Sequence, residues 1–207
     1  MIPLANRVAI VNHGLSNLNS IARAIEECGG NPLVTSDPKE LRQVNRIILP
    51  GVGAFPTAVE RLRASGLFDA LREEVDRRAV PLLGICLGMQ LLAESSSEGG
   101  SNVGLGLIPG AVVKLAPMNR ERIPHMGWNE VGPLTESTLF RGIPSGTDFY
   151  FVHSYCLVCP EPYVLARTPY CGEFVSAAAN GSVMAVQFHP EKSQRAGFQL
   201  LQNFLAA

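Results

Sequence analysis

The chain has few charged residues, almost no net charge and no long apolar run. Charged residues make up 17% of its 207 residues, the formal net charge is −1, and lysine and arginine are not clustered. A nucleic-acid or membrane-surface partner would need such a basic patch. The apolar runs fall far short of the roughly 20 residues that cross a bilayer, and no signal-peptide pattern opens the sequence. We therefore expect a cytoplasmic globular protein.

Cysteine is also scarce, and its pattern argues against a disulfide framework. The five cysteines are an odd number without a secretion signal, which is typical of reduced thiols. Cys156 and Cys159 have the spacing of a redox or metal pair, but they lie in a strand-like run and no second ligand pair accompanies them. No glycine-rich phosphate-binding motif is present either. We expect no metal, no cofactor, and buried strand cysteines at these two positions.

The order of apolar runs and helical patterns predicts the fold class. In the first half, strand-like runs at 8–11, 33–35, 46–49 and 80–83 alternate with helical patterns at 18–25, 38–43, 57–63, 67–78 and 87–94. From about residue 103 most runs are β-like, at 111–115, 149–153, 156–167, 173–178 and 182–188, and a last helix covers 193–205. We expect one α/β domain over residues 1–207. It would have a doubly wound, mostly parallel sheet with helices on both faces and an additional antiparallel β layer.

The segment 84–88, Gly-Ile-Cys-Leu-Gly, has the pattern of a nucleophile elbow. Cys86 stands between two glycines, after an apolar run and before a helical pattern. A sharp strand–turn–helix connection would hold the sulfur at its tip, and glycine is needed where the chain packs closely. N–H groups at the helix start would favour the thiolate, which is the nucleophile. A buried structural cysteine would fit this short pattern equally well.

A second segment supplies the groups that a cysteine nucleophile needs. His189-Pro190-Glu191 follows the alternating run 182–188, so the histidine would lie at a strand end, where open α/β sheets carry their sites. Glu191 could bind one ring nitrogen and leave the other for the sulfur. By itself the motif also fits a surface histidine and glutamate. Together with the elbow, it predicts a catalytic triad of Cys86, His189 and Glu191.

These motifs, in this order and together with Pro-Gly-Val-Gly at 50–53, resemble those of class I, triad-type glutamine amidotransferases over essentially the whole chain. Within that family the segments 124–129, 150–155 and 189–193 are similar to the glutaminase subunits of imidazole glycerol phosphate synthase, from histidine biosynthesis. One turn departs from the pattern. Residues 14–17 read Gly-Leu-Ser-Asn where that family often has Gly-x-Gly-Asn, and this turn is expected near the partner subunit.

The resemblance implies hydrolysis of glutamine to glutamate and ammonia through a γ-glutamyl thioester on Cys86. His189 would take the thiol proton and return it to the leaving amine. The oxyanion hole would consist of the backbone N–H groups of Leu87 and Val52. Six residues are candidates for binding the rest of glutamine: Gly53, Gln90, Glu98, His153, Ser154 and Tyr155.

The resemblance also implies a partner, because the chain has no site for a second chemistry. The partner would be a (β/α)₈-barrel cyclase subunit, joined as a heterodimer, that uses the ammonia to form imidazole glycerol phosphate and AICAR. Trp128, the single tryptophan, lies in a loop bounded by glycine and proline and is either a partner contact or a core residue. Lys192 is either a contact to the partner or the glutamate loop, or a surface lysine.

Three other interpretations remain open at this point. The chain could be the glutaminase of another ammonia-channelling synthase, such as the anthranilate or pyridoxal phosphate type, although the segment 124–129 argues against it. It could be a cysteine hydrolase on a related fold, whose base would usually lie nearer the elbow in sequence. It could also be a binding module with an inactive triad, but all three triad residue types are intact.

Overall fold

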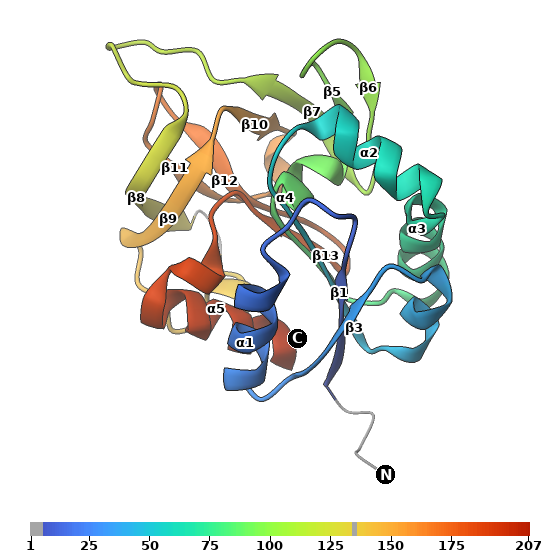
Figure 1. The fold of residues 1–207 in the computed structure, drawn as a ribbon. Helices are drawn as coiled ribbons and strands as arrows, with labels where there is room; N and C mark the ends of the chain where they lie inside the picture. The colour runs from blue at the N-terminus through green and yellow to red at the C-terminus, as the bar shows by residue number, and fades with distance from the viewer. Residues whose placement is uncertain (1–5, 134–135) are drawn as a thin grey trace.

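The computed structural model describes residues 6–133 and 136–207 (Figure 1). The strands are β1 (Arg7–Val11), β2 (Asn31–Thr35), β3 (Arg46–Gly51), β4 (Leu82–Cys86), β5 (Ala93–Ser96), β6 (Asn102–Val103), β7 (Ile108–Lys114), β8 (His125–Pro133), β9 (Thr147–His153), β10 (Tyr155–Val158), β11 (Val164–Thr168), β12 (Phe174–Asn180) and β13 (Val183–Val186). The α-helices are α1 (Leu18–Glu27), α2 (Phe55–Ala64), α3 (Leu67–Arg78), α4 (Leu87–Leu91) and α5 (Gln194–Ala206). Short 3₁₀ helices are η1 (Pro38–Gln43), η2 (Thr138–Phe140), η3 (Glu161–Tyr163) and η4 (Pro190–Lys192). In this part of the chain no helix is both long and apolar enough to span a membrane.

The described strands form two sheets. The larger has nine strands in the order β2-β1-β3-β4-β13-β12-β11-β8-β9. Its first five strands are joined by parallel pairs and the remaining ones by antiparallel pairs. The smaller sheet has the order β10-β7-β5-β6. The predicted α/β fold, with its mostly parallel core and added antiparallel strands, is confirmed. Part of the antiparallel addition extends the main sheet instead of forming a separate layer.

Helices cover both faces of the parallel half of the main sheet (Figure 1). Successive residues of a strand point to opposite faces, so one strand contributes to two cores. In β1, Ala9 and Val11 pack in the core that contains residues of α2 and α3. Val8 and Ile10 pack in the core that contains residues of α1 and α5. This double burial explains why these strands are continuous apolar runs in the sequence.

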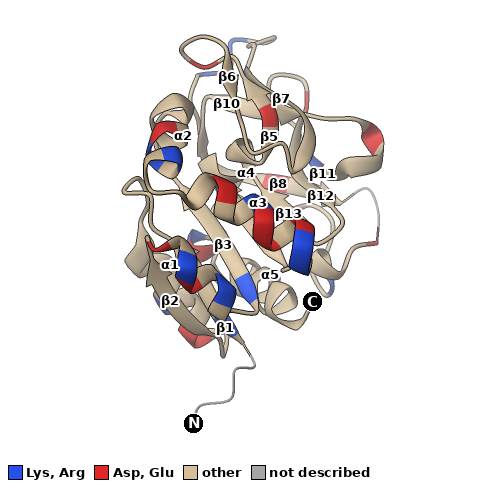
Figure 2. Cartoon of the chain, turned by 90° about the vertical axis from the view of Figure 1, so that its right-hand side faces the viewer, with Lys and Arg blue, Asp and Glu red and all other residues tan. Residues whose placement is uncertain are grey.

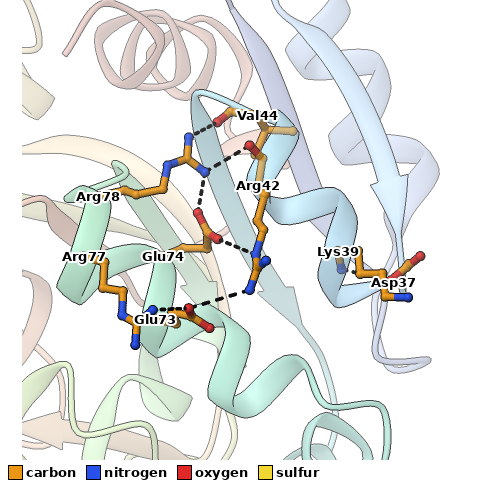
Figure 3. Close-up of polar contacts among 8 residues, drawn as sticks. All are labelled: Asp37, Lys39, Arg42, Val44, Glu73, Glu74, Arg77 and Arg78. Carbon is orange, nitrogen blue, oxygen red and sulfur yellow. Dashed lines mark hydrogen bonds and ion pairs between the residues drawn. The ribbon is translucent and has the colours of Figure 1, made fainter.

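Charged residues of both signs lie along α3 (Figure 2). Glu74 has a side chain only 5% exposed, and it pairs with Arg78 and with Arg42 of η1 (Figure 3). Arg78 also donates to the carbonyl oxygens of Arg42 at 3.1 Å and Val44 at 3.3 Å. Exposed ion pairs add little stability by themselves. Here the buried carboxylate needs its partners, and the network fixes α3 against η1.

The structure corrects three predicted boundaries. The loop expected around Trp128 is the nine-residue strand β8, which pairs with β9 from His125 to Val131. Neighbouring glycine and proline suggested a loop, yet an antiparallel pair accommodates them. The helix expected at 87–94 ends at Leu91. The carbonyls of Leu91 and Leu92 accept from the N–H groups of Leu105 and Ile108, so they are not available to continue the helix. The long strand expected at 156–167 is divided into β10 and β11 by η3.

We expect Gly88→Ala to lower the free energy of unfolding by about 1–3 kcal/mol, the usual cost of overpacking a tight core. A Cβ at Gly88 would overlap the carbonyl oxygen of Leu49 on β3, so α4 or β3 would have to move. Urea unfolding measures the change. Gly132→Ala is the control, since its added Cβ would meet nothing closer than Arg167 O at 3.6 Å. Equal unfolding midpoints for the two variants would contradict the close α4–β3 contact.

Candidate active site

Cys86 ends β4 and directly precedes α4, at a sharp turn. Its backbone has φ 55° and ψ −110°, which is unusual for a residue with a side chain. The turn is held from both sides, because β4 pairs with β3 and β13. It also needs the small residues on either side of it, since a Cβ at Gly84 would lie 2.6 Å from the Leu92 side chain. The sulfur is therefore placed by a strained turn within a rigid sheet. The five-residue α4 makes only a small helix dipole.

His189 lies just beyond β13, the strand that neighbours β4. Its Nδ1 is 2.8 Å from Oε1 of Glu191, and both side chains are buried. Its Nε2 has no hydrogen-bond partner among the described residues. Burial lowers the pKa of His189, but the Cys86 sulfur and the Glu191 carboxylate raise it more strongly, to about 10. The carboxylate thus fixes one ring proton on Nδ1, and the raised pKa makes Nε2 a strong acceptor for the proton of the Cys86 thiol.

The segment 50–53 runs beside the nucleophile, because Gly51 of β3 pairs with Cys86 of β4. Of the two predicted oxyanion donors, Leu87 is at the first position of α4, where backbone N–H groups lack partners within the helix. The Val52 N–H instead donates to the carbonyl oxygen of Leu15 at 2.7 Å. It is therefore engaged by the 14–17 turn, and only a rotation of its peptide would free it for the site.

A cavity of about 290 Å³ opens at Cys86. Of the predicted site residues, it brings together all but His189 and Glu191: Val52, Gly53, Cys86, Leu87, Gln90, Glu98, His153, Ser154 and Tyr155. Pro124 and Val152 also line it and were not predicted. Among the described residues, no group of three His, Cys, Asp or Glu side chains is arranged to hold a metal ion.

Two of the predicted binding residues are held in place by hydrogen bonds. Glu98 Oε2 accepts from the backbone N–H of Phe55 at the start of α2, at 2.9 Å. Gln90 Nε2 donates to the Tyr155 carbonyl at 2.8 Å and to Gln187 Oε1 at 3.1 Å. Both hydrogens of the Gln90 amide are therefore used, and its Oε1 is left as the group for a ligand.

His153 lines the cavity, and a second buried histidine, His125, lies against it. His153 Nδ1 is 2.8 Å from the Tyr155 carbonyl, and its Nε2 is 3.0 Å from His125 Nδ1. Because a carbonyl only accepts, His153 carries its proton on Nδ1, so His125 must donate from its own Nδ1. His125 Nε2 then accepts from Asn129, 3.2 Å away. Burial lowers the pKa of His125 to about 4 and that of His153 to about 3.

Sequence reasoning assigned no role to His125, Asn129 or Gln187. A signal was present for Gln187, because it precedes His189 by two residues in an alternating run, the spacing of side chains on one face of an extended chain. No local signal pointed to His125 and Asn129. Both belong to β8, the strand that was expected to be a loop.

Comparisons with known proteins agree with this geometry. The family model "Glutamine amidotransferase class-I" matches residues 9–207. A solved structure described as a glutamine amidotransferase has a TM-score of 0.77 and 20% identity, covering 97% of this chain and 99% of that chain, which supports the fold alone. The chain belongs to the class I glutamine amidotransferase family.

Its curated relatives define the position within that family. The imidazole glycerol phosphate synthase subunit HisH of Moorella thermoacetica is 49% identical over 198 residues, or 95% of this chain and 93% of the relative. Subunit HisH 1 of Campylobacter jejuni (strain RM1221) is 43% identical over 198 residues, or 96% and 98%. HisH of the archaeon Archaeoglobus fulgidus is 42% identical over 198 residues, or 96% and 97%. Within class I, the chain groups with these HisH subunits.

We expect the stability of the protein to fall as the pH is lowered from about 6.5 to about 4. Folded His125 has its pKa lowered from 6.5 to about 4, so the unfolded state binds protons in this range that the folded state does not. Urea unfolding at several pH values measures the slope of the free energy of unfolding against pH. His125→Phe should show a shallower slope than the unmodified chain. An unchanged slope in the variant would show that His125 does not resist protonation.

Proposed function

We propose that the chain hydrolyses glutamine to glutamate and ammonia at Cys86, His189 and Glu191, as the glutaminase subunit of an imidazole glycerol phosphate synthase. The observation that carries the proposal is the position of a strained cysteine at the mouth of a cavity beside a buried histidine. That histidine is bound to a carboxylate through one nitrogen, and its other nitrogen is free. This is the arrangement of nucleophile, base and orienting group that acyl transfer requires.

The chemistry follows from these three side chains. His189 Nε2 takes the thiol proton while the Cys86 sulfur attacks the side-chain amide carbon of glutamine, giving a tetrahedral oxyanion. The imidazolium then gives its proton to the nitrogen, the C–N bond breaks, and ammonia leaves a γ-glutamyl thioester on Cys86. Water, deprotonated by His189, attacks the thioester. Glutamate leaves and the sulfur takes back the proton.

One of the two proposed oxyanion donors is engaged elsewhere, which suggests how hydrolysis is controlled. Leu87, the first residue of α4, would supply one donor, whereas the Val52 N–H donates to the Leu15 oxygen. Losing one such donor costs about 2.7–4 kcal/mol of barrier, or roughly a hundredfold to a thousandfold in rate. The peptide that carries this N–H joins Gly51 to Val52, and a glycine at its start offers little steric resistance to rotation. Rotation of the Val52 peptide would therefore switch the glutaminase on.

The cavity offers suitable groups for the amino-acid end of glutamine. Gln90 Oε1 and the Glu98 carboxylate are acceptors for its ammonium group. His153 stays neutral because burial lowers its pKa to about 3, so this wall adds no positive charge against the ammonium. Ser154 and Tyr155, between β9 and β10, complete the cavity on the same side. Its volume of about 290 Å³ gives room for a small zwitterion.

The proposal includes a partner, because free ammonia in water at neutral pH is mostly ammonium and a poor nucleophile. We infer a (β/α)₈-barrel cyclase subunit that receives the ammonia in a heterodimer. The outer face of β8 supports a docking surface near the cavity. Met126 is 62% exposed and Trp128 is 49% exposed, so the tryptophan is not a core residue. Trp128 packs edge to face on Tyr150, with ring centroids 6.0 Å apart, and Lys192 Nζ lies 5.6 Å from the centre of the Tyr150 ring.

Glutamate release from glutamine should be strongly stimulated by a cyclase barrel subunit loaded with its nucleotide ligand. The expected reason is that docking frees the Val52 N–H, and the assay compares the chain alone, with the empty barrel and with the loaded barrel. An equal rate of glutamate release with and without the barrel would support the glutaminase function and show that its partner is a different protein. No hydrolysis in any condition would favour a cysteine hydrolase with another substrate, or an inactive triad.

Cys86→Ala should abolish glutaminase activity and leave synthesis from added ammonium salts intact in the same complex. The substitution removes only the sulfur, whereas the partner's own reaction needs ammonia from any source. Product formation with glutamine and with ammonium chloride gives the two rates. Normal glutamine turnover by this variant would rule out the thioester mechanism.

A further inference from the structure

A side chain outside the predicted site contacts the nucleophile itself. Gln187 Nε2 donates to Cys86 Sγ across 3.7 Å, within hydrogen-bond range for sulfur. The Gln187 side chain is completely buried, at 0% exposure. Its backbone N–H donates to Ser176 O on β12 at 2.9 Å, which anchors the segment between β13 and His189. A buried amide fixed against a reacting atom is placed to act on that atom.

The hydrogen bonds around Gln187 determine which end of its amide faces the sulfur. The Tyr155 carbonyl can only accept, so the Gln90 atom 2.8 Å from it must be the NH₂ nitrogen. The same nitrogen lies 3.1 Å from Gln187, so the Gln187 atom there must be the oxygen. The NH₂ group of Gln187 is then the end that points at Cys86. The amide could not be reversed without leaving two donors facing each other.

The sulfur has two polar neighbours with opposite preferences, besides His189. The carbonyl oxygen of Val152 lies 3.7 Å away and accepts the S–H of the thiol, so it suits the protonated form. The Gln187 N–H suits the negatively charged form, because a donor stabilises an anion and a buried anion has little help from water. When His189 removes the proton, the sulfur loses its bond to Val152 and keeps the one to Gln187.

We propose that Gln187 is a catalytic residue, whose amide N–H stabilises the thiolate of Cys86 and fixes its position for attack on the glutamine amide. The same contact stabilises the sulfur again when it leaves as a thiolate during thioester hydrolysis. A neutral donor fits this double use, since it stabilises the anion without adding a further charge, whereas a carboxylate would repel it. The proposal rests on the glutaminase function proposed above, but the contact can be tested without glutamine.

Two substitutions remove the donor in different ways. Gln187→Met keeps the length and volume of the side chain without polar atoms. Gln187→Glu keeps an oxygen for Gln90 and removes the N–H groups. The matched control is Ser176→Ala, which deletes a buried hydroxyl without a hydrogen-bond partner among the described residues, on the strand that anchors Gln187. Thermal unfolding shows that each variant is folded. Gln187→Met decides the test because it adds no charge beside the sulfur, and unchanged rates in Gln187→Glu would overturn the proposal as well.

The first readout is the rate at which iodoacetamide alkylates Cys86 between pH 5 and about 10, followed by peptide mass mapping, with Cys159 in the same chain as the internal reference. At pH 7 the two donor-free variants should react at Cys86 about tenfold to a hundredfold more slowly, the usual effect of a hydrogen bond to a charged group. Their rate profiles should move to higher pH. Ser176→Ala and the Cys159 rate should be unchanged.

The second readout is glutamate release in the complex with the loaded barrel. The kcat of the donor-free variants should fall by a similar factor, with KM changed less than about threefold, because Gln187 acts on the sulfur and not on bound glutamine. Alkylation and kcat within about threefold of the unmodified chain would overturn the proposal and leave Gln187 as a packing residue. Failure of the unmodified chain to hydrolyse glutamine would instead overturn the proposed function, and the alkylation rates would still decide the role of Gln187.

Discussion

The structure depends on one close contact, the packing of the β4–α4 turn against β3. Gly88 has no side chain, so α4 approaches the Leu49 carbonyl directly, and the backbone of Cys86 is held at a positive φ. Because β3, β4 and β13 are parallel neighbours, their carboxyl ends meet at the same edge of the sheet. That edge carries the turn at 50–53, the nucleophile, and the segment with Gln187 and His189. Pairing among these three strands compensates for the strained backbone of Cys86.

The surroundings of the site shift the pKa values of its histidines in opposite directions. His189 has its pKa raised to about 10 by the adjacent sulfur and carboxylate, whereas His125 and His153 have theirs lowered by burial. Divergent pKa values of like groups are typical of active sites, where one group must take a proton and the others must not. Here the neutral pair fixes the Tyr155 carbonyl, to which Gln90 also donates. Through Gln90 and Gln187, the wall of the cavity is joined to the nucleophile.

Much of this could be predicted from the sequence, because several features are local. The apolar runs gave the parallel strands, since strands covered on both faces tolerate few polar residues. The glycines around Cys86 indicated its sharp turn, and the short His-Pro-Glu motif indicated the contact between His189 and Glu191. What could not be predicted depends on contacts between distant segments. The end of α4 is set by N–H groups more than a dozen residues later, β8 exists because β9 pairs with it, and the direction of the Val52 N–H is decided by the turn at 14–17.

The bond between the Val52 N–H and the Leu15 oxygen joins two backbone groups, and this has an evolutionary consequence. No side-chain replacement in the turn at 14–17 can delete either group, so the turn is free to drift while the restraint on the oxyanion loop is inherited unchanged. Ser16 stands where glycine is frequent in the family, and its φ is not in the left-handed region. The residue of this turn with a left-handed φ is Gly14, at 81°. The proposed control of the reaction can therefore persist while the side chains of these four residues change.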